Sequence, residues 1–290
     1  MRHHRWFKIL ALLLPLLLLA AACGDDEDDP ESSSASAGSA SGEEAEEPAQ
    51  EEPATDLSVG LVYDLGGRGD KSFNDAAAAG LDRAVEELGI EAPEELAPDE
   101  GGENREELMR LLAENGTGLI FGVGFLFGDS ITAAAPDFPD SRFAIIDSVV
   151  EADNVASLVF AEEQGSYLVG AAAALKSQTG HIGFIGGVEN ELIQKFEAGY
   201  TAGAKSINPD IEVEVAYITQ PPDFGGFNDP ARGKEIAAGM LGGGADIVYG
   251  AAGGSGTGII DAVVEAKAGG SNVWAIGVDS DQYELVEGAA

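Results

Sequence analysis

The chain has 290 residues, with 52 acidic and 15 basic side chains, and its formal net charge at pH 7 is −37. Nucleic acids and anionic lipid surfaces are recognised by cationic faces, so this balance argues against either as the main partner. Cys23 is the only cysteine, which excludes a disulfide within the chain and leaves stability to the hydrophobic core.

Residues 1–22 have the pattern of a secretory signal peptide. Arg2, Arg5 and Lys8 give a positive start, and residues 9–22 form an apolar run interrupted by Pro15. A run of this length with these flanks is typical of a signal-peptide core and is too short to predict a membrane span.

Cys23 follows this core directly, after small residues, and the position resembles the processing site of a bacterial lipoprotein. The match is imperfect, because the leucine is at position 19 and Ala20 occupies the place three residues before the cysteine. We expect Cys23 to become the lipidated first residue, which would hold the protein on the cell membrane, facing outside the cytoplasm. An ordinary secretory signal with a stray thiol is the alternative.

The segment after Cys23, up to residue 56, has a different composition from the rest of the chain. Residues 24–56 contain thirteen Asp and Glu and no Lys or Arg, and are otherwise mostly Ser, Ala, Gly, Pro and Gln. Such a segment cannot bury enough apolar surface to offset its conformational entropy. Residues 23–56 are therefore predicted to be a lipidated cysteine followed by a disordered acidic tether, with a reach of roughly 30 Å.

Three apolar runs in the remaining chain each end on an aspartate, at Asp64, Asp147 and Asp279. Short apolar runs followed by helical patterns predict buried parallel strands. In open α/β sheets the ligand crevice lies beyond the carboxyl ends of the strands, so the three carboxylates are expected to converge on one cleft. Carboxylates accept hydrogen bonds in pairs, which suits a neutral sugar or nucleoside better than an anion. The alternative is that each aspartate caps the helix that follows it.

Strands and helices are predicted to alternate along the whole of this part. The helices are expected at about 73–88, 104–114, 164–176, 191–206, 230–241 and 257–268. The other strands are expected at 118–124, 155–161, 182–187, 212–219 and 246–249. No strand is placed in the Glu-, Pro- and Gly-rich residues 90–101. This alternation predicts an α/β fold of two doubly wound lobes, an N-terminal lobe over 57–160 and a C-terminal lobe over 161–290, with a ligand cleft between them.

A series of motifs runs through residues 57–290. They are Tyr-Asp at 63–64, Asp-Lys-Ser-Phe-Asn at 70–74, Phe-Ala-Ile-Ile-Asp at 143–147, Gly-Gly at 186–187 with Phe-Glu-Ala-Gly at 196–199, Phe-Asn-Asp-Pro-Ala-Arg-Gly-Lys-Glu at 227–235, Ala-Gly-Gly-Ser-Gly at 252–256 and Ile-Gly-Val-Asp-Ser-Asp-Gln at 276–282. In this order they resemble the basic membrane lipoprotein (Bmp, PnrA-like) family. The resemblance implies a type I periplasmic-binding fold and a monomeric, cofactor-free lipoprotein that captures purine nucleosides for an ABC importer and its permease subunits.

The resemblance also implies which residues of the first lobe bind the ligand. The triplet Ser72, Phe73 and Asn74 would hold the nucleobase, with Phe73 stacked on the purine. Asn74 could donate to and accept from the base edge at the same time. Asp147 would take a base N–H, and Asp64 could accept from the base or the ribose.

The second lobe is expected to complete the site. Phe227 is the first choice for the other face of an aromatic sandwich, and Tyr249 is its competitor. Asp279 would accept from the 2′ and 3′ hydroxyls of the ribose. Gly253 and Gly254 would let backbone amides approach the same sugar.

Two other functions stay open at this point. The same fold could bind a pentose or another small metabolite. Clustered aspartates could also hold a metal and hydrolyse nucleosides, but each of the three aspartates is alone on its strand, and no metal-ligand spacing or nucleophile–base pair is found. We therefore expect no catalytic residues and no metal.

The end of the chain differs from the family pattern. In the family, the segment after the motif at 276–282 continues through another crossing between the lobes and carries a ligand-contacting lysine. This chain ends at Ala290. The resemblance therefore predicts that the C-terminal lobe is incomplete and the C-terminus truncated.

Overall fold

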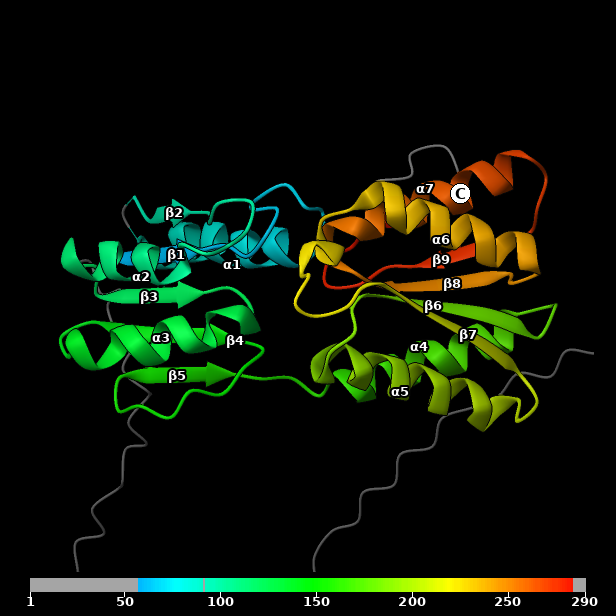
Figure 1. The fold of residues 1–290 in the computed structure, drawn as a ribbon, viewed down its shortest axis with the longest axis horizontal. Coiled ribbons are helices and arrows are strands. Elements are labelled where there is room, and N and C mark those ends of the chain that lie inside the picture. Colours follow the sequence, from blue (N-terminus) through cyan, green and yellow to red (C-terminus); the bar gives the residue numbers. More distant parts are fainter. Residues whose placement is uncertain (1–56, 91, 284–290) are drawn as a thin grey trace, which may run out of the picture. The chain divides into compact units, whose positions relative to one another are not determined.

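The computed structural model describes residues 57–90 and 92–283. The predicted signal peptide, Cys23 and the acidic segment lie outside these residues. In the first part of the chain the elements are β1 (Val59–Val62), α1 (Phe73–Leu88), β2 (Glu94–Leu96), α2 (Arg105–Glu114), β3 (Leu119–Gly122), η1 (Phe125–Phe127), α3 (Gly128–Ala134), η2 (Ala135–Asp137), β4 (Arg142–Ile146) and β5 (Val155–Leu158) (Figure 1).

The second part of the chain begins with a helix and repeats the alternation. Its elements are α4 (Glu162–Lys176), β6 (His181–Val188), α5 (Glu191–Ile207), β7 (Glu212–Thr219), η3 (Gly225–Phe227), α6 (Pro230–Gly243), β8 (Ile247–Ala251), η4 (Gly253–Ser255), α7 (Gly256–Ala268) and β9 (Trp274–Ile276).

The strands form two sheets, and every pairing in them is parallel. The first sheet has the order β2-β1-β3-β4-β5 and the second the order β7-β6-β8-β9. The central strands β1 and β8 are buried along their whole length, as is usual for parallel strands covered on both faces. The predicted α/β class with parallel sheets is confirmed.

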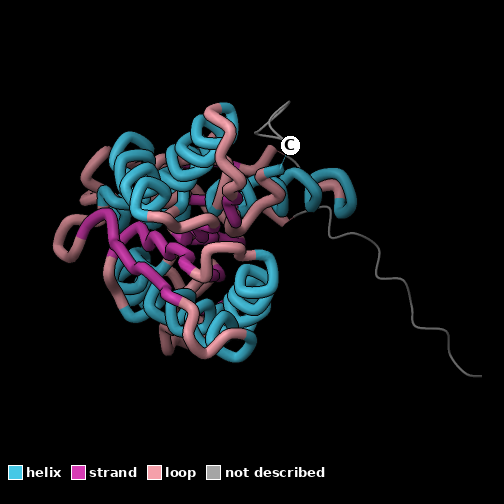
Figure 2. The backbone as a smooth tube through the Cα atoms, turned by 90° about the vertical axis from the view of Figure 1, so that its right-hand side faces the viewer, coloured by secondary structure: helices cyan, strands magenta, loops and turns pink. Residues whose placement is uncertain are grey.

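Each sheet has apolar contacts on both of its faces, and Figure 2 shows the strands lying between helices. On the first sheet, α2 and α3 pack over one face and α1 over the other. On the second sheet, α4 and α5 cover one face and α6 and α7 the other. The strand ends that carry the aspartates are therefore held in fixed positions by packing on both sides.

Glycine allows α4 and α5 to approach very closely. A Cβ atom on Gly203 would overlap the backbone carbonyl of Tyr167, and one on Gly199 would overlap that of Glu163. This contact places the first turns of α5, with Leu192 and Phe196, at the end of the second sheet where the cavity lies.

Two elements, an edge strand of the first sheet and a short helix packed on it, are not predicted from the sequence. The edge strand β2 has the sequence Glu-Glu-Leu and is largely exposed, so neither apolar alternation nor strand propensity marks it. Helix α3 has only seven residues and lies between two short 3₁₀ turns, so it is too short to show a helical period.

No helix within residues 57–90 and 92–283 is both long enough and apolar enough to cross a membrane.

Candidate ligand-binding site

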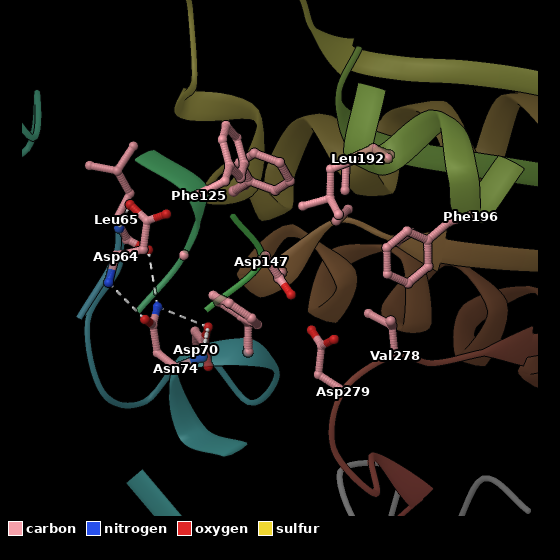
Figure 3. Close-up of a pocket in the computed structure, with 17 residues that line it drawn as sticks. Asp64, Leu65, Asp70, Asn74, Phe125, Asp147, Leu192, Phe196, Val278 and Asp279 are labelled. Carbon is pink, nitrogen blue, oxygen red and sulfur yellow. Dashed lines mark hydrogen bonds between the residues drawn. The ribbon is translucent and has the colours of Figure 1, made fainter. Parts of the chain in front are cut away.

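A cavity lies at the carboxyl ends of strands from both sheets (Figure 3). Among the described residues, its lining is apolar except for four aspartates and one asparagine. The polar side chains are those of Asp64, Asp70, Asn74, Asp147 and Asp279, and the aromatic side chains are those of Phe73, Phe125, Phe196 and Phe227.

Asp64 follows β1 and is buried against Arg105 of α2. Arg105 Nη2 donates to Asp64 Oδ1 at 2.7 Å, and the Leu65 N–H donates to the same oxygen at 2.8 Å. Among the described residues, no group donates to the second oxygen, Oδ2. Burial raises the pKa of Asp64, and the Arg105 guanidinium opposes that rise. The ion pair thus leaves one carboxylate oxygen available to the cavity.

Asp70 and Asn74 organise the turn that leads into α1. Asp70 accepts from the backbone N–H groups of Ser72 (2.9 Å), Asn74 (2.9 Å) and Asp75 (3.0 Å). Asn74 Nδ2 donates to Asp70 Oδ2 at 3.1 Å and to the Leu65 carbonyl at 3.3 Å. Asn74 Oδ1 accepts from the Asp64 N–H at 2.9 Å (Figure 3). Both amide hydrogens of Asn74 are therefore used within the protein, and only its oxygen has a lone pair left for a ligand.

Asp147 and Asp279 point into the cavity from the two sheets (Figure 3). Both have left-handed backbone conformations, with φ of 64° and 66°, which aspartate tolerates better than most residues. Asp279 Oδ2 accepts from Ser72 Oγ at 2.7 Å. No hydrogen bond to the Asp147 side chain is found within the described part of the chain.

The pKa values of these two carboxyls are raised. Burial raises the pKa of Asp147 to about 7, and the charges of Asp279 and Glu162 add to the rise while Lys195 opposes it. The dense protein surroundings raise the pKa of Asp279 to about 6, and the hydrogen bond from Ser72 opposes that rise. Asp279 is exposed to water, which weakens the effect, so of these two carboxyls Asp147 has the more strongly raised pKa.

Ser72 is fully buried and does not line the cavity. Its hydroxyl instead connects the α1 turn to Asp279. Two further bonds reinforce this contact: Ser280 Oγ donates to the Ser72 carbonyl, and Gln282 Nε2 donates to the Lys71 carbonyl, both at 2.8 Å. The turn before α1 and the segment after β9 are thus held together beside the cavity.

Phe73 and Phe227 line the cavity from the two halves of the chain, whereas Tyr249 does not line it. The Tyr249 ring packs in the core beneath the second sheet, 5.6 Å from the Phe184 ring and 5.2 Å from the Tyr200 ring. Its hydroxyl lies 3.5 Å from Ser166 Oγ. Tyr249 borders an adjoining hollow instead, which shares Phe73, Asp147 and Asp279 with the cavity.

The two predicted glycines differ in position. Gly253 lines the cavity with a φ of 54°, and Gly254 is buried behind it. Gly124, at the end of β3, is a site residue that the sequence does not predict. Its φ is 109°, and a Cβ there would lie 2.7 Å from Asp64 Oδ2 and 3.3 Å from Phe73 Cε1.

Several other residues of the site are not expected from the sequence. Phe125 packs edge to face against Phe227 and Phe224, with centroid distances of 6.3 and 6.0 Å. Phe196 lies on α5, and only its membership of a motif marks it. Arg105 looks like any surface arginine near the start of an acidic helix, because its partner is 41 residues away in sequence.

Among the described residues, no group of three or more His, Cys, Asp or Glu side chains is arranged to hold a metal ion.

Residues 57–289 match the family described as ABC transporter substrate-binding protein PnrA-like. The chain belongs to this family. The predicted resemblance is thereby confirmed, and the family consists of solute-binding proteins, not enzymes.

Individual relatives agree with this assignment. The ABC transporter nucleoside-binding protein BmpA of Lactococcus lactis subsp. cremoris (strain MG1363) is 40% identical over 237 residues, which cover 80% of this chain and 66% of that protein. Basic membrane protein A of Borreliella burgdorferi (strain ATCC 35210 / DSM 4680 / CIP 102532 / B31) is 37% identical over 231 residues, which cover 78% of this chain and 64% of that protein.

A solved structure supports the fold. The crystal structure of an ABC transporter solute-binding protein from Aeropyrum pernix K1 has a TM-score of 0.71 and 35% identity to this chain, covering 78% of it and 64% of the other protein. The chain thus spans about two thirds of the length of the relatives it matches.

The Arg105–Asp64 pair gives a first test of the site's construction. Arg105→Gln should lower the free energy of unfolding by about 3–5 kcal/mol, because Asp64 would be left buried without its cation. Urea denaturation measures this loss. Arg110→Gln is the matched control, since Arg110 lies on the same helix and its partners Glu106 and Asp137 are exposed; it should cost less than about 1 kcal/mol. Equal losses in the two variants would contradict the structural role of the pair.

The raised pKa of Asp147 predicts a pH dependence of stability. Because the folded pKa of about 7 exceeds the ordinary value of 3.8, folding favours the protonated carboxyl. This contribution is fully present below about pH 4 and is lost as the pH rises through about 7. Asp147→Asn should therefore match wild type near pH 4 and be more stable by about 1–2 kcal/mol at pH 8. Asp153→Asn, an exposed change in the same loop, should show no such trend when unfolding is measured across this range.

Proposed function

We propose that this chain is the purine-nucleoside-binding component of an ABC importer. The observation that carries the proposal is the composition of the cavity, in which Phe73 and Phe227 accompany the carboxylates of Asp64, Asp147 and Asp279. Flat apolar faces suit a nucleobase, and acceptor oxygens suit the N–H and O–H groups of an uncharged nucleoside. The Lactococcus relative, a nucleoside-binding protein by name, supports the same ligand class.

The base is assigned to the end of the cavity that Phe73 and Asp64 form. The ring of Phe73 stacks on the purine, and Phe227 of η3 closes the opposite face. Phe125 supports Phe227 from the side through its edge-to-face contact. Asp64 Oδ2 and Asp147 accept from the base edge, and Asn74 contributes its oxygen only, since its N–H groups are already bonded.

The ribose is assigned to Asp279 and Gly253. One carboxylate can accept from two neighbouring hydroxyls, and Ser72 fixes the orientation of the Asp279 carboxylate by donating to Oδ2. Gly253 lets the backbone come close to the sugar, with Gly254 behind it. A free pentose would use this end alone and leave the aromatic faces unused, so it serves as the comparison ligand.

Delivery to a membrane permease requires the binding protein to stay near the membrane. We propose that Cys23 is lipidated and anchors the chain on the outer side of the cell membrane. The acidic residues 24–56 would then separate the anchor from the binding domain. The negative surface of the binding domain does not favour direct adsorption to anionic lipid.

Phe73→Ala tests the stacking role. Loss of one aromatic face should weaken guanosine and adenosine binding by roughly ten- to a hundredfold, corresponding to about 1–3 kcal/mol. Isothermal titration calorimetry measures the affinity, and chromatography of the recovered ligand shows whether it returns unaltered. Tyr167→Ala, which removes a partly exposed ring from α4, is the control and should bind as wild type does. If the protein bound ribose tightly and bound no nucleoside, the proposal would be overturned.

Cys23→Ser tests the anchor. The variant should incorporate no labelled fatty acid and should appear in the soluble fraction, because a thiol is needed for the lipid linkage. Labelling in a bacterial host that processes lipoproteins, followed by fractionation, measures both effects. If the variant remains with the membranes as wild type does, the anchor lies elsewhere.

A further inference from the structure

Phe125 contacts two phenylalanines from the other half of the chain. It begins η1 just after β3 of the first sheet, whereas Phe224 immediately precedes η3 and Phe227 ends it, after β7 of the second sheet. The Phe125 ring centroid lies 6.0 Å from that of Phe224 and 6.3 Å from that of Phe227, with interplanar angles of 63° and 70°. Edge-to-face pairs at such distances attract beyond the effect of the area they bury. The three rings thus form an aromatic contact between the two halves.

Each of the two turns that carry these rings is fixed to its own sheet. Phe127, two residues after Phe125, is fully buried in the core of the first sheet. In η3, Gly226 lies so close to β6 that a Cβ atom on it would overlap the Gly187 carbonyl. The Gly226 carbonyl also accepts from Ser255 Oγ at 2.8 Å. Because both turns are anchored in this way, the rings separate when the two sheets move apart.

The aromatic contact lies beside the cavity and extends beyond its lining. Phe125 and Phe227 line the cavity, whereas Phe224 does not. The halves are also joined at Asp279, which accepts from the turn before α1. Figure 3 shows Asp279 away from Phe125, with Asp147 between them in that view. A ligand in the cavity therefore lies between two places where the halves are joined, and Phe224 strengthens one of them without lining the cavity.

We propose that Phe224 is a positioning residue that keeps the two halves together around the bound ligand and so slows its release. The inference rests on the proposed nucleoside-binding function. Phe224 acts through Phe125, because its ring packs on Phe125 from outside the cavity while Phe227, one of the two rings assigned to the base, packs on it from the cavity wall. Loss of the Phe224 ring weakens the aromatic contact, so the halves separate more readily and the ligand dissociates faster. The rate of association should change little, as is usual for variants of one binding site.

The test is the dissociation rate of a purine nucleoside from folded Phe224→Ala. Protein loaded with 2-aminopurine riboside, a fluorescent nucleoside, is mixed with excess guanosine in a stopped-flow instrument. The rate should rise roughly three- to tenfold, as the strength of one aromatic pair implies. Phe224→Tyr keeps the ring and should release the ligand nearly as wild type does, as should the control Tyr167→Ala. A rate within twofold of wild type in folded Phe224→Ala would overturn the inference.

A double-mutant cycle shows whether Phe224 acts through Phe125. In a Phe125→Ala background the pair is already lost, so adding Phe224→Ala should change the dissociation rate less than twofold. The same three- to tenfold increase in both backgrounds would contradict the assignment. Circular dichroism checks the fold of each variant. If Phe224→Ala does not fold, Phe224→Leu takes its place, since leucine keeps an apolar side chain but has no ring.

A measurement without ligand separates this inference from the proposed function. Ala133→Cys on α3 and Ala238→Cys on α6, both at exposed positions, accept one spin label in each half of the Cys23→Ser protein. Pulsed electron paramagnetic resonance gives the distances between the labels. Phe224→Ala should increase the share of long distances, and unchanged distances would count against the aromatic contact as what holds the halves together. If wild type binds no nucleoside, the proposed function fails, and these distances still decide whether Phe224 joins the halves.

Discussion

Negative charge gathers at the cavity, and no cation lines it within the described residues, so each carboxylate depends on local donors. Asp64 is balanced by Arg105, which approaches from behind the cavity wall. Asp70 accepts four bonds from its own turn. Asp279 receives one bond, from Ser72. Asp147 receives none from the described residues, so no hydrogen bond offsets the burial that raises its pKa.

The parallel sheets explain how these carboxylates come together. Parallel strands place all their carboxyl ends at one edge, so residues far apart in sequence meet there. Asp147 and Asp279 then use a left-handed backbone conformation to leave their strands. Helices on both faces fix the strand ends, and the close contact of α4 with α5 positions Phe196 at the same edge. The site is thus a product of sheet topology more than of any one motif.

Much of the fold could be read from the sequence, because its helices and buried strands are long enough to show their periods. Helix α1 and strand β7 lie where they are expected, whereas the exposed β2 and the short α3 give no periodic signal. Within the site, the sequence locates the aspartates at the strand ends. It does not identify the side chains that donate hydrogen bonds to them. Nothing local predicts that Arg105 pairs with Asp64, or that Asn74 uses both amide hydrogens internally. Tyr249 is expected to end a strand but lies in the middle of β8, with its ring packed in the core, and only the structure decides between the two faces of a strand.

The carboxylates and aromatic rings of the described lining make different demands on a ligand. Water can satisfy exposed carboxylate oxygens, but it cannot also cover the faces of Phe73 and Phe227. A ligand with both N–H or O–H groups and a flat apolar body does both at once. A phosphate would instead add negative charge beside the carboxylates of the described lining, which is electrostatically unfavourable. Because Ser72 of the first half bonds Asp279 of the second, the orientation of the Asp279 carboxylate depends on contact between the two halves. In the proposed mode of binding, recognition of the sugar and the joining of the two halves rely on the same carboxylate.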